Sequence, residues 1–245
     1  MAAALCTAAV AQTPVKNLYT SGETLDLGQL QNTEQTVQLN RYLFAGWNTL
    51  CLPLSYSAQQ FAAQDIRLER LVGIAQEGNT LNLYFLDCTN EGIQAGQPYL
   101  VFSPRSQMLR LTNIEATAVS DYLKVVRFDD RAGNVVSFGS SWTAQRQEGR
   151  YGIPAKQETT PLESILIRTD SEKAFLPTRC GFSWEQQSAT ATDLAIRHIQ
   201  SPDEATGITS LDSGTSVDVI YDLSGRKLTN AGRGIVIQNG KKVLK

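Results

Sequence analysis

Short apolar segments separated by turn residues fill most of this chain, and this pattern constrains its fold more than any other feature. From residue 71 to residue 184, segments such as LVGIAQ, LNLYFLD, PYLVFSP and NVVSFGSSW alternate with connections that carry Gly, Asn or Asp. Such segments are typical of strands, and their close spacing favours a sandwich or a barrel. We therefore predict an all-β protein whose main domain, residues 13–188, is sandwich-like, built as one sandwich or as two packed β subdomains.

Alternation within the segments predicts where their side chains point. In GWNTLCLPL, residues 46–54, an extended chain places alternate side chains on opposite faces, with Trp47, Thr49 and Cys51 on one and Asn48, Leu50 and Leu52 on the other. The one helix that we expect follows Ser57, a residue type that caps helix N-termini, and lasts about two turns. From Leu71 onward the succession of strand, turn and strand predicts a β-meander.

The last part of the chain predicts a linker followed by a small β unit. Residues 189–216 are rich in Ala, Ser, Thr and Asp, which is typical of linkers, although one apolar patch covers residues 194–199. Residues 217–245 return to strand-like alternation, and Asn239-Gly240 separates GIVIQ from KKVLK. Asn-Gly accommodates the positive φ angles of a type I′ turn, so we predict that a hairpin ends a short C-terminal β-meander tail.

Charge and hydropathy argue against two kinds of partner. The chain carries 22 Lys and Arg against 24 Asp and Glu, a formal net charge of -2. It therefore has no broad positive field to attract phosphate backbones, and we expect no nucleic-acid partner. No apolar run approaches the length of about 20 residues that a membrane-spanning helix needs, so we expect no transmembrane segment.

The first residues are typical of an export signal. Residues 2–11 are small and mostly apolar, and Ala9-Val10-Ala11 fits the Ala-x-Ala pattern at which signal peptidases cleave. We predict that residues 1–11 are a signal-peptide remnant, that cleavage follows Ala11, and that the protein is extracellular or at the cell surface. The alternative is a disordered Ala-rich terminus. Leu5 stands before Cys6, where lipid attachment would need a small residue, so a lipid anchor is disfavoured.

Cysteine and histidine usage argues against a metal centre. Beyond the leader the chain has Cys51, Cys88 and Cys180, each in an apolar or strand-like segment, where a thiol is most often a buried hydrophobic group. Three cysteines allow at most one internal disulfide. There is no Cys-x-x-Cys pair and His198 is the only histidine, so we expect no metal site and no cofactor.

No group of residues forms a convincing catalytic pattern. Serine chemistry needs a histidine base, but His198 falls in the predicted linker and the chain has no Gly-x-Ser-x-Gly elbow. Glycoside hydrolysis needs two carboxylates, and candidates exist, but their spacing carries no information because any β protein supplies similar pairs. These candidates are Asp65, Glu69, Asp87 and Glu91. We therefore predict no catalytic residue.

Two further segments have alternative interpretations. Residues 129–134, DDRAGN, contain several oxygen ligands but lack the spacing of a calcium loop, and they suit a hairpin turn better. Trp142 follows Gly139-Ser140-Ser141 and precedes the polar segment TAQRQEGR. Its ring is either packed under a loop or exposed as an aromatic platform for sugars, which makes Trp142 the one candidate ligand-binding residue.

Three segments carry a resemblance to a known group of proteins. They are GWNTLCLPL at residues 46–54, IQAGQPYLV at residues 93–101, and the tail with YDLSGRKL and GIVIQNGKKVLK. Together they resemble exported β proteins of the Bacteroides and Prevotella type, whose C-terminal tails are related to type IX secretion sorting domains. The resemblance implies a surface or secreted location and recognition of the tail by secretion machinery, but no activity. In the tail it rests on Tyr221, Gly225, Arg226, Gly234, Asn239, Gly240 and Lys241.

A binding function fits these observations best. We expect a non-catalytic binding or adhesion module whose partner is a glycan or a host matrix protein, because a β scaffold with variable loops suits binding and needs no catalytic group. The first alternative is a structural subunit of a cell-envelope assembly, which would self-associate through sheet edges. The second is a glycan hydrolase, which would show turnover.

Overall fold

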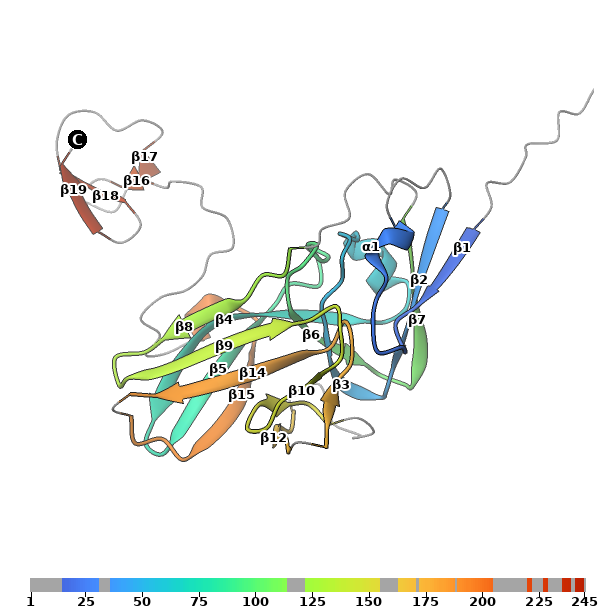
Figure 1. Cartoon of the computed structure of the whole chain (residues 1–245). Coiled ribbons are helices and arrows are strands. Elements are labelled where there is room, and N and C mark those ends of the chain that lie inside the picture. Colours follow the sequence, from blue (N-terminus) through green and yellow to red (C-terminus); the bar gives the residue numbers. More distant parts are fainter. Residues whose placement is uncertain are drawn as a thin grey trace, which may run out of the picture. The chain divides into compact units, whose positions relative to one another are not determined.

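Strands make up nearly all of the regular structure, which confirms the predicted all-β class (Figure 1). The computed structural model describes residues 15–30, 36–113, 122–154, 163–170, 172–187 and 189–204, together with four short strands between residues 220 and 244. The chain divides into two compact units, residues 1–211 and residues 212–245. The predicted leader, residues 1–11, lies outside the described residues.

Two five-stranded sheets pack face to face in the first unit and confirm the sandwich-like fold. One sheet has the order β15-β5-β4-β6-β3, with β3 at Gly46–Leu50, β4 at Arg67–Glu77, β5 at Thr80–Asp87, β6 at Tyr99–Ser103 and β15 at Asp193–Ile199. The other has the order β12-β11-β14-β9-β8, with β8 at Val126–Asp129, β9 at Asn134–Ser140, β11 at Tyr151–Gly152, β12 at Ile167–Arg168 and β14 at Cys180–Gln186. Between them the ring of Phe85 lies edge-on to Phe138 and Phe182, with centroids 5.6 and 6.0 Å away.

A third, smaller sheet and one helix bury the opposite face of β3, β6 and the first part of β4. The sheet has the order β1-β2-β7, with β1 at Val15–Tyr19, β2 at Thr36–Leu43 and β7 at Gln107–Asn113. Helix α1, Ala58–Ala62, has Ser57 at its N-cap as predicted, although the Ser57 side chain makes no capping hydrogen bond. Phe61 of this helix belongs with Leu39 and Leu109 to a second buried cluster.

Strand β3 separates the two cores as its alternation predicts. Trp47 and Cys51 belong to the sandwich core, while Leu50 and Leu52 belong to the second cluster. The smaller elements lie around this frame: the 3-10 turns η1 at Leu27–Leu30 and η2 at Pro202–Glu204, and the strand pair β10 at Gln145–Arg146 and β13 at Ala174–Phe175.

Two predictions about the connectivity of the first unit are wrong. Strands β4 and β5 form the expected hairpin, but β6 pairs with β4 rather than with β5, so the chain does not continue as a meander there. Residues 193–199, predicted as part of a linker, form β15, which pairs in parallel with β5. Two effects explain the strand: Ile196 and Ile199 are buried, and the backbone of β15 pairs with the edge of β5, whose N–H and C=O groups would otherwise lack partners.

The second unit is a four-stranded sheet in the order β17-β16-β18-β19, with β16 at Ile220–Tyr221, β17 at Lys227–Leu228, β18 at Ile235–Gln238 and β19 at Lys241–Leu244. Gln238 pairs with Lys241, so the predicted hairpin around residues 239–240 is confirmed. The tail is not the simple meander that the sequence predicts, because β18 pairs with β16 rather than with β17. Of the tail positions named above, Tyr221 and Lys241 lie in strands, and the others lie outside the described residues. None of the described helices is long and apolar enough to span a membrane.

Candidate functional site

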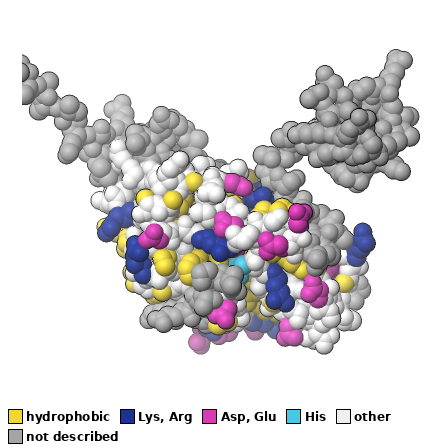
Figure 2. Space-filling view, turned by 180° about the vertical axis from the view of Figure 1, so that it is seen from behind, with side chains coloured by type: hydrophobic (Ala, Val, Ile, Leu, Met, Phe, Trp, Pro, Cys, Tyr) yellow, Lys and Arg dark blue, Asp and Glu magenta, His cyan; other side chains and the backbone are white. Residues whose placement is uncertain are grey.

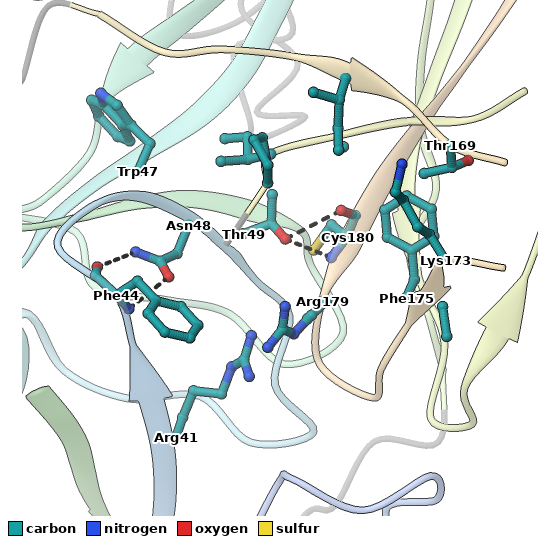
Figure 3. A pocket seen from close by; sticks show the side chains of 15 residues that line it. Arg41, Phe44, Trp47, Asn48, Thr49, Thr169, Lys173, Phe175, Arg179 and Cys180 are labelled. Carbon is teal, nitrogen blue, oxygen red and sulfur yellow. Dashed lines mark hydrogen bonds between the residues drawn. The ribbon is translucent and has the colours of Figure 1, made fainter. Parts of the chain in front are cut away.

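A cavity of about 310 Å³ lies where β2, β3, β12 and the segment before β14 meet (Figure 3). Aromatic and aliphatic side chains form much of its wall, including Phe44, Trp47, Ile167 and Phe175. Three cationic side chains line it as well, and none of the described lining residues is acidic. An apolar cavity with a few polar groups is the usual form of a small-molecule site.

Two of the cations that line the cavity are arginines, and their surroundings indicate what kind of ligand the cavity can bind. Arg41 projects from β2 and is only 4% exposed, and Figure 3 shows its guanidinium group beside that of Arg179. The Nε atoms of both residues are shielded from solvent and have no hydrogen-bond partner in the described part of the chain. Burial, and secondly the charge of Arg179, lower the pKa of Arg41 to about 9, and burial also lowers the pKa of Arg179. Because buried charges are normally paired, this arrangement calls for an anion.

Apart from the indole Nε1 atom of Trp47, which has no hydrogen-bond partner among the described residues, the other polar side chains of the cavity already have partners. The Asn48 amide donates to the Phe44 carbonyl at 2.9 Å and accepts from the Phe44 amide at 3.1 Å. The Thr49 hydroxyl accepts from the Cys180 amide at 2.8 Å and donates to the Cys180 carbonyl at 3.2 Å. Lys173, the third cation, pairs with Asp170 at 3.0 Å. Among the described residues that line the cavity, the guanidinium groups of Arg41 and Arg179 are therefore the cationic donors left for a ligand, and the Trp47 indole is a neutral one.

Local backbone features hold the two sides of the cavity in place. The ring of Phe175 lies against Gly152 and Gly181, where an added Cβ atom would come within 2.7 and 2.9 Å of that ring. Thr178, directly before Arg179, has a φ of 68°, a value that β-branched residues rarely adopt. The Thr178 carbonyl accepts from the Cys51 amide at 2.9 Å, which ties this segment to the end of β3. Strain of this kind concentrates at functional sites.

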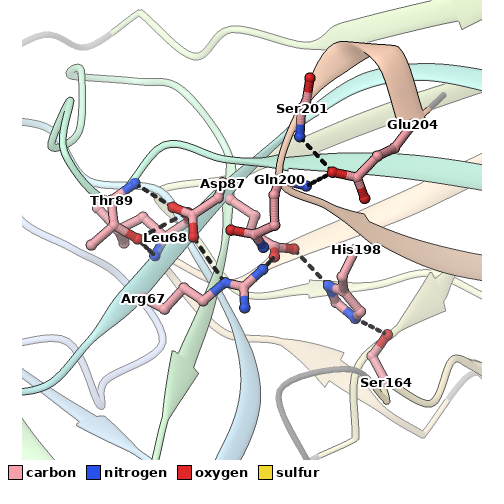
Figure 4. Close-up of polar contacts among 10 residues, drawn as sticks. Arg67, Leu68, Asp87, Thr89, Ser164, His198, Gln200, Ser201 and Glu204 are labelled. Atoms are coloured by element: carbon pink, nitrogen blue, oxygen red, sulfur yellow. Dashed lines mark hydrogen bonds and ion pairs between the residues drawn. The ribbon is translucent and has the colours of Figure 1, made fainter.

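A second group of polar residues surrounds the single histidine (Figure 4). His198 lies on β15, its Nδ1 atom is 2.6 Å from Glu69 Oε2, and its Nε2 atom is 3.0 Å from Ser164 Oγ. Arg67 holds the other oxygen of Glu69 at 2.5 Å and contacts Asp87 at 3.2 Å. The His198 ring also stacks on Trp47, with centroids 4.2 Å apart and planes 10° apart. Because β15 and β3 are the two edges of one sheet, that sheet must curl strongly.

The four carboxylates considered for glycoside hydrolysis all face arginines. Besides the contacts of Glu69 and Asp87 with Arg67, Asp65 lies 3.0 Å from Arg105, and Glu91 lies 3.8 Å from Arg70. Residues 129–134 form a hairpin turn between β8 and β9, as predicted, and Asp130 accepts a hydrogen bond from the Asn134 amide at 2.8 Å.

The remaining predicted positions are placed as follows. Trp142 is half-buried and packs beside the cluster formed by Leu18, Leu25 and Val37, so ligand binding by its ring stays a prediction. Cys51, Cys88 and Cys180 are buried free thiols, as their apolar sequence surroundings predict.

Sequence reasoning missed both polar groups, although each left a signal. Arg41 occupies the same strand face as Val37, Leu39 and Leu43, all fully buried, so alternation could have revealed a cation pointing inward. His198 likewise follows Leu194 and Ile196 at intervals of two. The partners Glu69, Ser164 and Arg179 gave no such signal, because only the fold brings them near.

No protein-family model, no curated protein and no solved structure matches this chain.

Proposed function

We propose that this protein is a ligand-binding or adhesion module that captures a small carboxylate-bearing molecule in the arginine-lined cavity. The observation that carries the proposal is the pair of guanidinium groups formed by buried Arg41 and half-buried Arg179, whose shielded Nε atoms share one cavity and which have no described acidic partner. Two such groups offer the planar, forked donor pattern that matches a carboxylate.

The walls of the cavity narrow the ligand class. Trp47 and Phe175 present aromatic rings, and Ile153, Pro154 and Ile167 add aliphatic surface. A ligand with one carboxylate and a ring-shaped or apolar body would satisfy both parts. This class includes acidic sugars and aromatic acids, so it agrees with the expectation of a glycan partner drawn from the sequence.

The test compares acids with their neutral counterparts. The chain from Gln12 to Lys245 would be titrated with glucuronate against glucose, with benzoate against benzamide, and with inorganic phosphate, all at one ionic strength. We expect a carboxylate to raise the thermal midpoint, since a ligand at one hundred times its Kd adds about 2.7 kcal/mol to the free energy of unfolding. Benzoate and glucuronate distinguish an aromatic acid from an acidic sugar.

Variants at the two arginines assign the effect to the cavity. Arg41→Met and Arg179→Met should abolish the ligand-induced shift, yet each should unfold at an equal or higher denaturant concentration without ligand, because a buried unpaired charge has been removed. Arg127→Met, at an exposed position on β8, makes the same charge change outside the cavity and should bind normally. Equal responses to acids and neutral analogues, or unaltered binding in both cavity variants, would refute the proposal.

We further propose that the protein acts outside the cytoplasm and that its tail directs it there. The leader-like residues 1–11 and the sorting-like tail support this location, and the tail folds as a compact unit of its own. Fractionation of cells that express the chain with and without this unit tests the idea.

A further inference from the structure

The three residues Ser164, His198 and Glu69 form a continuous hydrogen-bonded chain in the order hydroxyl, imidazole, carboxylate (Figure 4). They come from three separate parts of the sequence: the segment before β12, strand β15 and strand β4. Each nitrogen of the imidazole ring serves one partner. This is the order of nucleophile, general base and orienting acid that activates a serine hydroxyl in unrelated folds.

Two charged or polar partners surround the carboxyl group at the acid end of this chain. Glu69 is fully buried, and burial raises the pKa of its carboxyl group, while His198 and Arg67 oppose that shift. Arg67 bonds one carboxylate oxygen and leaves the other for the imidazole. When Glu69 is ionised, its Oε2 atom accepts the proton on His198 Nδ1, and in that tautomer Nε2 has a free lone pair facing Ser164 Oγ.

The base is fixed in orientation and shielded from water. The His198 side chain is 2% exposed, and its ring lies flat against Trp47. In Figure 2 only a small area of the single histidine reaches the surface, among interspersed acidic and basic side chains. Ser164 is half-buried, so it is the most accessible of the three. A histidine held in this way loses little orientational freedom on accepting a proton.

We propose that Ser164 is a nucleophile for acyl esters, with His198 as its general base and Glu69 as the residue that positions His198. In the first step Oγ forms a bond to the acyl carbon, and its proton passes to His198 Nε2. The bond from that carbon to the alcohol oxygen then breaks, and the alcohol leaves with the same proton. Water, deprotonated by His198, releases the acyl group as a carboxylic acid and restores the Ser164 hydroxyl.

This activity goes beyond the proposed binding function and does not depend on it. None of the three residues lines the arginine cavity. An experiment that refutes one of the two proposals would therefore not refute the other.

The experiment uses a fluorophosphonate probe, which forms a bond between Ser Oγ and phosphorus and releases fluoride. The chain from Gln12 to Lys245 should gain one adduct, located on Ser164 by peptide mass mapping, when folded but not in guanidinium chloride. Ser164→Ala should abolish the adduct, and His198→Gln should slow labelling by at least about 100-fold, the usual contribution of a general base. With p-nitrophenyl acetate, the wild-type chain should release p-nitrophenolate faster than Ser164→Ala does.

A matched control is Ser57→Ala, because Ser57 is exposed and its hydroxyl makes no capping hydrogen bond. This variant should react at the wild-type rate. The proposal is wrong if the folded wild-type chain gains no adduct on Ser164 while a serine hydrolase standard is fully labelled. It is equally wrong if the unfolded chain labels Ser164 as fast as the folded one, a comparison that needs no folded His198 variant.

Discussion

At the scale of single residues, buried ionisable groups dominate the chemistry of the first unit. Arg41 and Arg179 are cations without a described acidic partner, whereas Glu69 is an acid surrounded by partners. The difference matters because an unpaired buried charge destabilises the fold until a ligand neutralises it, while a paired one is already satisfied. This difference is the reason for proposing ligand capture by the arginines and a positioning role for Glu69.

Because of its buried cysteines, we expect the protein to become less stable as the pH rises into the alkaline range. Burial raises the pKa of Cys180 from 9.0 to about 12 and also raises those of Cys51 and Cys88. The folded state thus holds these protons more tightly than the unfolded chain does. The stabilisation is complete below about pH 9 and is lost as the pH rises toward 12.

Guanidinium unfolding under reducing conditions checks this dependence. We expect the free energy of unfolding to fall above pH 9, by up to about 1.4 kcal/mol per pH unit for each thiol. Cys180→Ala should make this fall shallower, whatever its effect at pH 7. Parallel curves for the variant and the wild-type chain would contradict the argument.

At the scale of elements, β15 decides where the first unit ends. It pairs with β5 over seven residues, from Asp193 to Ile199, and supplies His198 to the core. Without it, β5 would present an unpaired edge, and the buried Ile196 and Ile199 would be lost from the two clusters they join.

Two truncated chains test the boundary. A chain of residues 12–188, the end that the sequence predicts, should aggregate or melt well below a chain of residues 12–211. Burial of an Ile side chain alone is worth about 1.5–3 kcal/mol, and the shorter chain loses two of them together with a strand pairing. Size-exclusion chromatography and thermal circular dichroism would show the difference, and matching midpoints would show that β15 is dispensable.

At the scale of the whole molecule, the chain consists of two compact units, for which we propose separate roles. The unit of residues 212–245 is a four-stranded sheet that clusters by itself, so it can be removed without cutting the sandwich. Such an arrangement suits an address carried behind an independent functional domain.

Deletion of residues 212–245 should separate targeting from stability. We expect the shortened chain to keep the thermal midpoint of the first unit within about 2 °C, because few contacts cross a boundary between domains. In a bacterium with type IX secretion, the full chain with its leader should reach the surface, and the shortened one should remain inside the envelope. Surface delivery of both chains would remove the sorting role.

The sequence alone determined the local features of this protein. Alternation in GWNTLCLPL fixed which side chains of β3 face each core, Asn239-Gly240 fixed the terminal hairpin, and DDRAGN fixed the β8–β9 turn. These depend on neighbouring residues, whose geometry follows from strand alternation and turn chemistry.

Only the tertiary structure decided strand order and the two polar sites. The pairing of β6 with β4, the parallel addition of β15, and the meeting of Arg41 with Arg179 join residues that lie far apart in the chain. Such contacts are selected by burial and by backbone hydrogen bonding over the whole fold, which no local pattern encodes. For the same reason the sequence does not indicate that Ser164 and His198 are neighbours. The fold places Ser164 Oγ and His198 Nε2 3.0 Å apart.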